Sequence, residues 1–291
     1  MQSRRAGLYC RFSMTATFHD RPRRSRSIPS TLVRRGRLLD VPLYYVLRSS
    51  DLVREGLDHS GSHRFADHIY RGEASGRGMF GRSLDALLLG LPAARAFRFR
   101  YAVARDEIAR FVLERLGRGA DAIAVLSVAC GIPRELTDAG ALVREHIGWL
   151  PHWISFYGLD LDRDVLAEAQ RFAAERGLAS FQAIHGDALD RHAYPEAIDF
   201  VSCTGLTEFL EDDVVVRLYE LLFDVLEPGG CLLTSGMQRR WAADYLLRLG
   251  EVATHYRDMS HLRRLAGPLP FRDVRTRIDE TGIQTVLIAR K

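Results

Sequence analysis

Residues 125–136 read VLSVACGIPREL, and this stretch decides the fold of the 291-residue chain. Small and apolar residues of good strand propensity lead into a turn at Gly131. Pro133 suits the first position of a helix, because the backbone N–H that proline lacks would have no partner there. A strand, a tight turn and a helix start bring backbone N–H groups close to a nucleotide-like ligand. We therefore expect the ligand site at this turn.

Around this stretch, strand-like and helix-like segments alternate along the chain. Because helical segments separate the short apolar runs, the strands should be parallel and buried on both faces. The expected fold is α/β, a Rossmann-like doubly wound and mostly parallel seven-stranded sheet. Its first five strands are expected at 123–130, 153–160, 180–185, 198–203 and 231–235, with helices at 134–146, 162–176, 212–226 and 239–249.

The end of the chain departs from this alternation. Two strand-like runs, 271–279 and 283–290, are separated only by Glu280, Thr281 and Gly282. This connection is too short for a parallel crossover, so it predicts an antiparallel hairpin. The sheet should therefore end with a C-terminal antiparallel hairpin.

The chain divides by composition into three parts. Residues 1–40 contain ten arginines and two aspartates and lack the apolar segment of a secretory signal. We expect a basic, disordered leader there, with a transit peptide or an early start codon as alternatives. Residues 41–118 predict helices, the longest running from Phe97 to Leu116 with apolar residues at helical spacing. Residues 119–291 form the α/β domain.

Charge and cysteine content exclude several functions. The chain carries a net charge of +4, and residues 1–40 carry +8, which leaves −4 for the remainder and argues against a nucleic-acid partner. No apolar run approaches the ~20 residues that span a bilayer. The four cysteines form no C-x-x-C pair, so we expect no metal site, no disulfide scaffold and a reducing, cytoplasmic location. Lys291 is the single lysine, which argues against Schiff-base chemistry.

Over about residues 121–291, the ends of successive strands resemble the motifs of the class I S-adenosylmethionine-dependent methyltransferases. The matching segments are 127–133, 158–160, 185–188, 199–205 and 226–232. The resemblance implies S-adenosyl-L-methionine as cofactor, with Asp160 binding the ribose hydroxyls and Asp187 the adenine amino group. The cofactor-binding residues that it implies are Ala129, Cys130, Gly131, Ile132, Pro133, Asp160, Leu161, Gly186, Asp187, Ala188, Thr204 and Gly205.

More narrowly, segments 67–71, 98–100 and 277–283 resemble a bacterial methyltransferase subgroup whose members include domains fused to hydrolases. In this fold an N-terminal helical segment commonly forms a lid over the cofactor. The resemblance therefore implies that residues 41–118 form an N-terminal helical lid.

The first motif departs from the family pattern. Only Gly131 remains of its glycines, and Ser127 or Ala129 replaces the acidic residue that holds the methionine amino group in the family. Recognition of the aminocarboxypropyl arm must therefore differ. Arg134 or Glu135 could contribute, although both residue types also occur as simple, exposed helix starters.

Five residues are candidates for chemistry beyond the cofactor. Glu208 follows the fourth strand, and it is either a catalytic carboxylate or a helix-start residue that the helix dipole favours. Tyr70 could offer a π face to a sulfonium or a hydroxyl to the acceptor. Arg100, Tyr101 and Gln238 are candidates for binding the acceptor, and packing within its helix is the alternative for Tyr101.

The sequence thus predicts a metal-independent enzyme that methylates a small molecule, with no membrane span and a homodimer as an open possibility. An alternative keeps the cofactor but attacks its γ-carbon. That reaction is cyclisation to azetidine-2-carboxylate or aminocarboxypropyl transfer, and it releases methylthioadenosine. A non-catalytic S-adenosylmethionine-binding module is a third interpretation.

Overall fold

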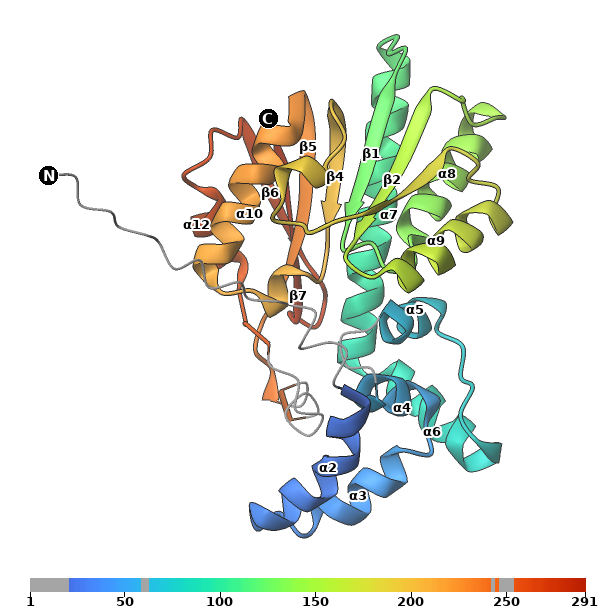
Figure 1. Ribbon diagram of the computed structural model, residues 1–291, viewed down its shortest axis with the longest axis vertical. Helices are drawn as coiled ribbons and strands as arrows, with labels where there is room; N and C mark the ends of the chain where they lie inside the picture. The colour runs from blue at the N-terminus through green and yellow to red at the C-terminus, as the bar shows by residue number, and fades with distance from the viewer. Residues whose placement is uncertain (1–20, 59–62, 242–243, 246–253) are drawn as a thin grey trace, which may run out of the picture.

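A computed structural model describes residues 21–58, 63–241, 244–245 and 254–291. Its centre is a seven-stranded sheet of order β3-β2-β1-β4-β5-β7-β6 (Figure 1). The strands are β1 Ile123–Val128, β2 Ile154–Asp160, β3 Phe181–His185, β4 Ile198–Cys203, β5 Leu226–Met237, β6 Asp273–Ile278 and β7 Gln284–Arg290. The first five are parallel, which confirms the predicted doubly wound fold.

The direction in which the chain adds strands reverses between β1 and β4, which are neighbours in the sheet. In open α/β sheets, ligands bind beyond the carboxyl ends of the strands at such a switch point. The expected turn after β1 lies at this place.

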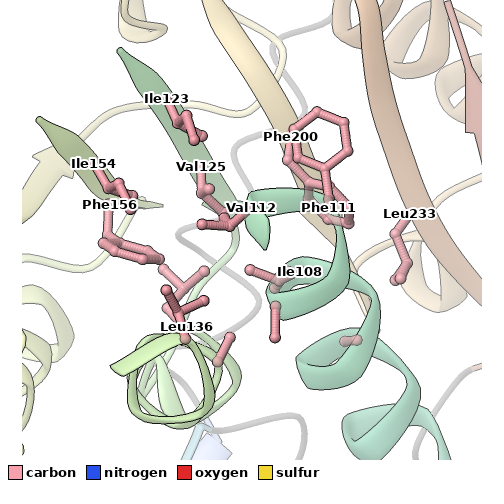
Figure 2. Packing of buried hydrophobic residues seen from close by; sticks show 14 of the residues in the cluster. Ile108, Phe111, Val112, Ile123, Val125, Leu136, Ile154, Phe156, Phe200 and Leu233 are labelled. Atoms are coloured by element: carbon pink, nitrogen blue, oxygen red, sulfur yellow. The ribbon is translucent and has the colours of Figure 1, made fainter. Parts of the chain in front are cut away.

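Helices cover both faces of the sheet. They are α7 Pro92–Gly117, α8 Arg134–Ile147 and α9 Arg163–Glu175 on one face, and α10 Asp212–Val225 and α12 Met259–Ala266 on the other. On the first face, Ile108 and Phe111 of α7 pack with Val125 of β1 and Phe200 of β4 (Figure 2). The rings of Phe111 and Phe200 meet edge to face, with their centroids 5.3 Å apart.

The predicted C-terminal hairpin is confirmed, since β6 and β7 pair antiparallel and β7 pairs antiparallel with β5. Asp279 fixes the turn by accepting backbone N–H bonds from Thr281, Ile283 and Gln284 at 2.8, 2.8 and 2.6 Å. β5 begins five residues before the predicted start at 231, because Leu226 already pairs with Ile198 across a register shift.

The N-terminal helices are α2 Arg21–Arg34, α3 Asp40–Leu47, α4 Asp51–Asp58, α5 His63–Arg71 and α6 Gly78–Gly90. α5 lies close to the end of the sheet at which β1 and β2 finish (Figure 1). α7 then runs from this helical part along the face of the sheet. Its 26 residues extend beyond the predicted range of Phe97 to Leu116, because Pro92 starts the helix one turn earlier.

Part of the basic N-terminal segment is helical. Residues 21–34 are helical rather than a disordered leader, because Ile28 and Leu32, one helical turn apart, are buried with Tyr44 and Leu47. Arginine-rich composition concealed this short apolar stripe. Residues 1–20 and most of the helix predicted at 239–249 lie outside the described residues.

Candidate active site

The turn after β1 has an unusual backbone. Ala129 and Gly131 both adopt a φ of 52°, a region that residues with a Cβ rarely occupy. The backbone N–H of Gly131 donates to Asp160 Oδ2 at 3.1 Å, and that of Cys130 donates to the carbonyl of Leu159 at 3.1 Å. The turn is therefore held against the carboxyl end of β2.

Asp160 is the carboxylate that holds this turn. Its Oδ1 accepts from the backbone N–H of Asp162 at 3.1 Å, so each carboxylate oxygen receives one bond. Burial raises the pKa of Asp160 although these two bonds oppose the shift. Each oxygen has a second lone pair, and two adjacent acceptors suit the two hydroxyls of a ribose. Asp162 itself caps α9, as expected.

The turn after β3 carries the adenine-binding candidates. A Cβ on Gly186 would lie 2.4 Å from the Cβ of Ala193, so only glycine fits without movement. Asp187 is exposed, and its Oδ1 accepts from the backbone N–H of Leu189 at 2.9 Å. The carbonyl of Ala188 accepts from the Tyr194 hydroxyl at 2.6 Å. Asp187 thus lies beyond the carboxyl end of β3, and its carboxylate oxygens can accept further hydrogen bonds.

Apolar side chains and two cysteines lie in the turn after β1 and at the ends of β2 and β4. Cys130 and Ile132 are buried, and burial raises the pKa of the Cys130 thiol well above its usual value. Cys203 at the end of β4 is buried too, and burial raises its pKa to about 12. Neither thiol is therefore ionised at neutral pH. Leu161 and Thr204 are half-buried at the ends of β2 and β4.

A buried polar cluster joins α5 and α7 to the segment after β4 and to the start of β7. Arg100 of α7 donates to Glu208 Oε1 at 3.1 Å and to the Tyr70 hydroxyl at 2.8 Å. Gln284 of β7 donates to the same Glu208 oxygen at 3.0 Å. Gly205, at a φ of 89°, leaves room for the guanidinium, because a Cβ there would lie 3.3 Å from Arg100 Nη1.

Three of the predicted residues, Tyr70, Arg100 and Glu208, therefore come together. Glu208 lies in the first turn of the 3-10 helix η2 Thr207–Phe209, as its helix-start interpretation expects, and it is only 4% exposed. Its carboxylate is engaged by a guanidinium and an amide. Glu208 is thus placed to position Arg100 rather than to act as a free base.

Tyr101 supports this cluster from the side. Its ring stacks on that of Tyr70, with centroids 5.0 Å apart, and its hydroxyl donates to Asp138 of α8. Burial raises the pKa of both tyrosines, so both phenols are neutral at neutral pH. Tyr101 thus packs against α5 and bonds to α8, and its role in binding an acceptor stays a prediction.

Gln238 does not join this cluster. Its backbone N–H donates to the carbonyl of Ile283 at 2.7 Å, and its amide donates to Thr285 at 3.5 Å. The sequence did not single out Gln284 as a member of the cluster. Because side chains alternate along a strand, Thr285, which Gln238 contacts, points to the opposite face of β7 from Gln284. The available signal was a glutamine at the start of the strand sequence QTVLIAR, which is otherwise suited to the core.

Arg134 and Glu135 are not exposed helix starters, and that interpretation is wrong for both. They are 6% and 7% exposed at the start of α8. Arg134 pairs with Asp67 of α5 at 2.7 Å and lies over the ring of Phe172. Glu135 Oε1 accepts from the Ser127 hydroxyl of β1 at 2.7 Å. The first turn of α8 therefore faces the interior.

The start of α5 lies on the β1 turn. A Cβ on Gly131 would be 2.8 Å from the Cβ of His63, so the two backbones approach closely. His63 also contacts Glu168 of α9 at 3.3 Å between Nε2 and Oε2. This contact and the Arg134–Asp67 pair hold α5 over the predicted cofactor site.

A group of three His, Cys, Asp or Glu side chains arranged to hold a metal does not occur among the described residues. None of their helices has both the length and the apolar character that crossing a membrane requires.

Comparison with known proteins adds a curated relative, the ubiquinone biosynthesis O-methyltransferase of Sodalis glossinidius. It is 30% identical over 159 residues, which are 50% of this chain and 56% of the relative. The match thus spans little more than half of that protein's length.

Solved structures share the fold at low identity. A protein of Bordetella parapertussis, described as a possible exported protein, has a TM-score of 0.75 and 21% identity and covers 96% of this chain and 99% of its own. Magnesium protoporphyrin IX methyltransferase of Synechocystis PCC 6803, solved with S-adenosylhomocysteine, has a TM-score of 0.52 and 14% identity, over 77% of this chain and 93% of its own.

The strongest comparison is with a family model. Residues 43–291 match the family described as "Putative methyltransferase". That range includes the N-terminal helices from α3 onward as well as the whole sheet. The chain therefore belongs to this family, and it has the fold of the class I S-adenosylmethionine-dependent methyltransferases.

Proposed function

We propose that the protein transfers the methyl group of S-adenosylmethionine to a small molecule. The observation that carries this proposal is the bond from the Gly131 N–H to Asp160 Oδ2, which joins the β1 turn to the end of β2. This places a positive-φ turn and a carboxylate with free acceptor positions at the switch point of the sheet. The bound cofactor would supply a methyl group that its positively charged sulfur activates.

The two turns suit the two halves of the nucleoside. Asp160 would accept the ribose hydroxyls, and Asp187 would accept from the adenine amino group. The absence of a side chain at Gly131 and Gly186 lets His63 and Ala193 pack closely against the two turns. Half-buried Leu161 and Ala188 would supply apolar surface beside the ring.

Tyr70 is the candidate catalytic residue toward the acceptor. Its oxygen accepts the hydrogen bond from Arg100, so the phenolic proton is available to donate to a ligand. Glu208 and Gln284 fix Arg100 and are positioning residues. Enclosure of this cluster under α5 would exclude water and align the acceptor for in-line attack.

We prefer an oxygen atom of the substrate as the group that accepts the methyl. The curated relative is named as an O-methyltransferase. An acceptor that binds as an ionised oxygen, such as a phenolate or carboxylate, has no proton to lose on methylation, and the neutral Tyr70 hydroxyl can orient that oxygen by donating a hydrogen bond. Arg100 and Glu208 are only 3% and 4% exposed. A site beside such deeply buried groups suits a small acceptor better than a macromolecule. A cytoplasmic location and a homodimer stay predictions.

The test is product analysis. The full chain is incubated with S-adenosylmethionine carrying a deuterated methyl group and with fractionated bacterial metabolites, and both nucleosides and labelled products are read by mass spectrometry. Equal amounts of S-adenosylhomocysteine and labelled product support the proposal. Methylthioadenosine as the enzymatic product would instead show attack on the γ-carbon, and turnover absent with every fraction would indicate a binding module. The variant Asp160→Ala serves as the cofactor-binding control.

A further inference from the structure

Glu135 is a buried acid that the roles proposed above do not use. It lies in the first turn of α8, directly after the β1 turn, and is 7% exposed. Its Oε1 accepts from the Ser127 hydroxyl at 2.7 Å. Within residues 21–58, 63–241, 244–245 and 254–291, no arginine, lysine or histidine side chain forms an ion pair with it. A buried carboxylate with a neutral donor is costly unless a cation joins it.

Glu135 has no cation in contact with it among the described residues. Arg100 is the cation whose field acts on it, and this guanidinium is already bonded to Glu208 and Tyr70. The Glu135 carboxylate is therefore neutralised by a proton unless a cation binds beside it. Burial raises the pKa of Glu135 although the Ser127 bond opposes the shift, as expected for a carboxylate without a close cation.

The position of Glu135 restricts what that cation can be. Ser127 lies in β1 two residues before Ala129, so the carboxylate is bonded to the strand that leads into the cofactor turn. S-Adenosylmethionine carries an ammonium group on its aminocarboxypropyl arm. At the same turn, Ser127 or Ala129 stands where an acid was expected to hold this group.

We propose that Glu135, oriented by Ser127, binds the ammonium group of the cofactor. The proposal rests on the proposed function, because it assumes that S-adenosylmethionine occupies the β1 turn. The acid then comes from the start of α8 rather than from the end of β1. Arg134, the other candidate, is excluded from this role by its pairing with Asp67 and by its like charge.

The test compares two ligands by calorimetry, with no turnover required. One is S-adenosylhomocysteine, and the other is its analogue without the α-amino group. The wild type should bind S-adenosylhomocysteine about 10- to 100-fold more tightly, the range for a hydrogen-bonded charge. In Glu135→Gln this preference should fall to a few-fold, while affinity for the analogue stays within about twofold.

Two variants complete the design. Glu145→Gln changes an exposed glutamate of the same helix and should keep the full preference. Ser127→Ala removes the orienting hydroxyl and should reduce the preference by a smaller factor, which tests the proposal even if Glu135→Gln does not fold.

Three results would overturn the inference. An equal loss of affinity for both ligands in Glu135→Gln would make Glu135 a purely structural residue. A wild type that binds both ligands equally would show that no group recognises the ammonium. A wild type that binds neither ligand would contradict the cofactor assignment itself, which separates failure of the proposed function from failure of this inference alone.

Discussion

Arg134 of α8 and Asp67 of α5 form a partly buried ion pair, with Nη2 and Nε of the arginine 2.7 and 2.8 Å from Asp67 Oδ1. The arginine and aspartate side chains are 8% and 18% exposed. Because the guanidinium also lies 4.9 Å from the centroid of the Phe172 ring, α5, α8 and α9 meet at this residue. The pair connects α5 directly to α8, the helix that follows the β1 turn.

Asp67→Asn should therefore loosen α5. Leaving Arg134 buried without its anion costs about 1–3 kcal/mol, and the cost falls on the contact between lid and sheet. Hydrogen exchange of the α5 amides should become faster, with little change in the core strands. Asp106→Asn is the control, because it breaks an exposed pair with Arg105 on α7. Identical α5 exchange in wild type and Asp67→Asn would contradict this role.

Asp160→Ala should weaken cofactor binding by about 1–3 kcal/mol, because it removes charged acceptors from the ribose site and frees the Gly131 N–H. Calorimetry with S-adenosylhomocysteine measures the effect. Asp164→Ala, an exposed position in the first turn of α9, should leave the affinity unchanged. Unaltered binding in Asp160→Ala would argue against the ribose assignment.

Gly205→Ala should impair the buried cluster, and the chain offers a matched control. Both Gly205 and Gly229 have positive φ, at 89° and 80°, so alanine costs about 1 kcal/mol of backbone strain at either site. A Cβ at Gly205 meets Arg100 at 3.3 Å, whereas one at Gly229 meets nothing within 4 Å. Denaturant unfolding should show a larger loss for Gly205→Ala. Equal losses of unfolding free energy at the two sites would mean that Arg100 moves away from the new Cβ at no energetic cost.

The stability of the lid should depend on pH through His68. The imidazole is 1% exposed and contacts Glu55 at 2.9 Å and Asp85 at 3.2 Å, and its Nε2 lies 3.0 Å from the Glu73 carbonyl. The hydrogen bond with Glu55 is the main cause that raises the pKa of His68, against burial. Its contribution to stability is therefore complete below about pH 6.5, the unfolded value, and is lost as pH rises through the folded pKa.

Chemical denaturation of wild type and His68→Gln between pH 5.5 and 9 measures this contribution. The difference in unfolding free energy should shrink as pH rises. His146→Gln, at an exposed position, should show no such trend. A constant difference for His68→Gln would mean that the imidazole does not change charge in this range.

The sequence alone determined the succession of strands and helices along the chain, and it predicts the cofactor site at the turn after β1. Buried parallel strands need continuous apolar runs, and Gly131 and the Glu280-Thr281-Gly282 connection mark turns whose geometry follows from local rules. Residues at strand ends, such as Asp160 and Asp187, could be located because parallel strands finish at one edge. These features depend on residues close together in the chain.

Only the tertiary structure decided which polar groups are buried and which groups they contact. Arg100 and Glu208 are 108 residues apart, and Gln284 lies 76 residues beyond Glu208, so no local pattern pairs them. Glu135 has the sequence appearance of an ordinary first-turn glutamate, and packing of α8 under α5 and α7 removes it from water. The balance of charge in such a cluster depends on distances that are set only when the N-terminal helices pack against the sheet. That balance makes Glu135 a candidate cofactor ligand.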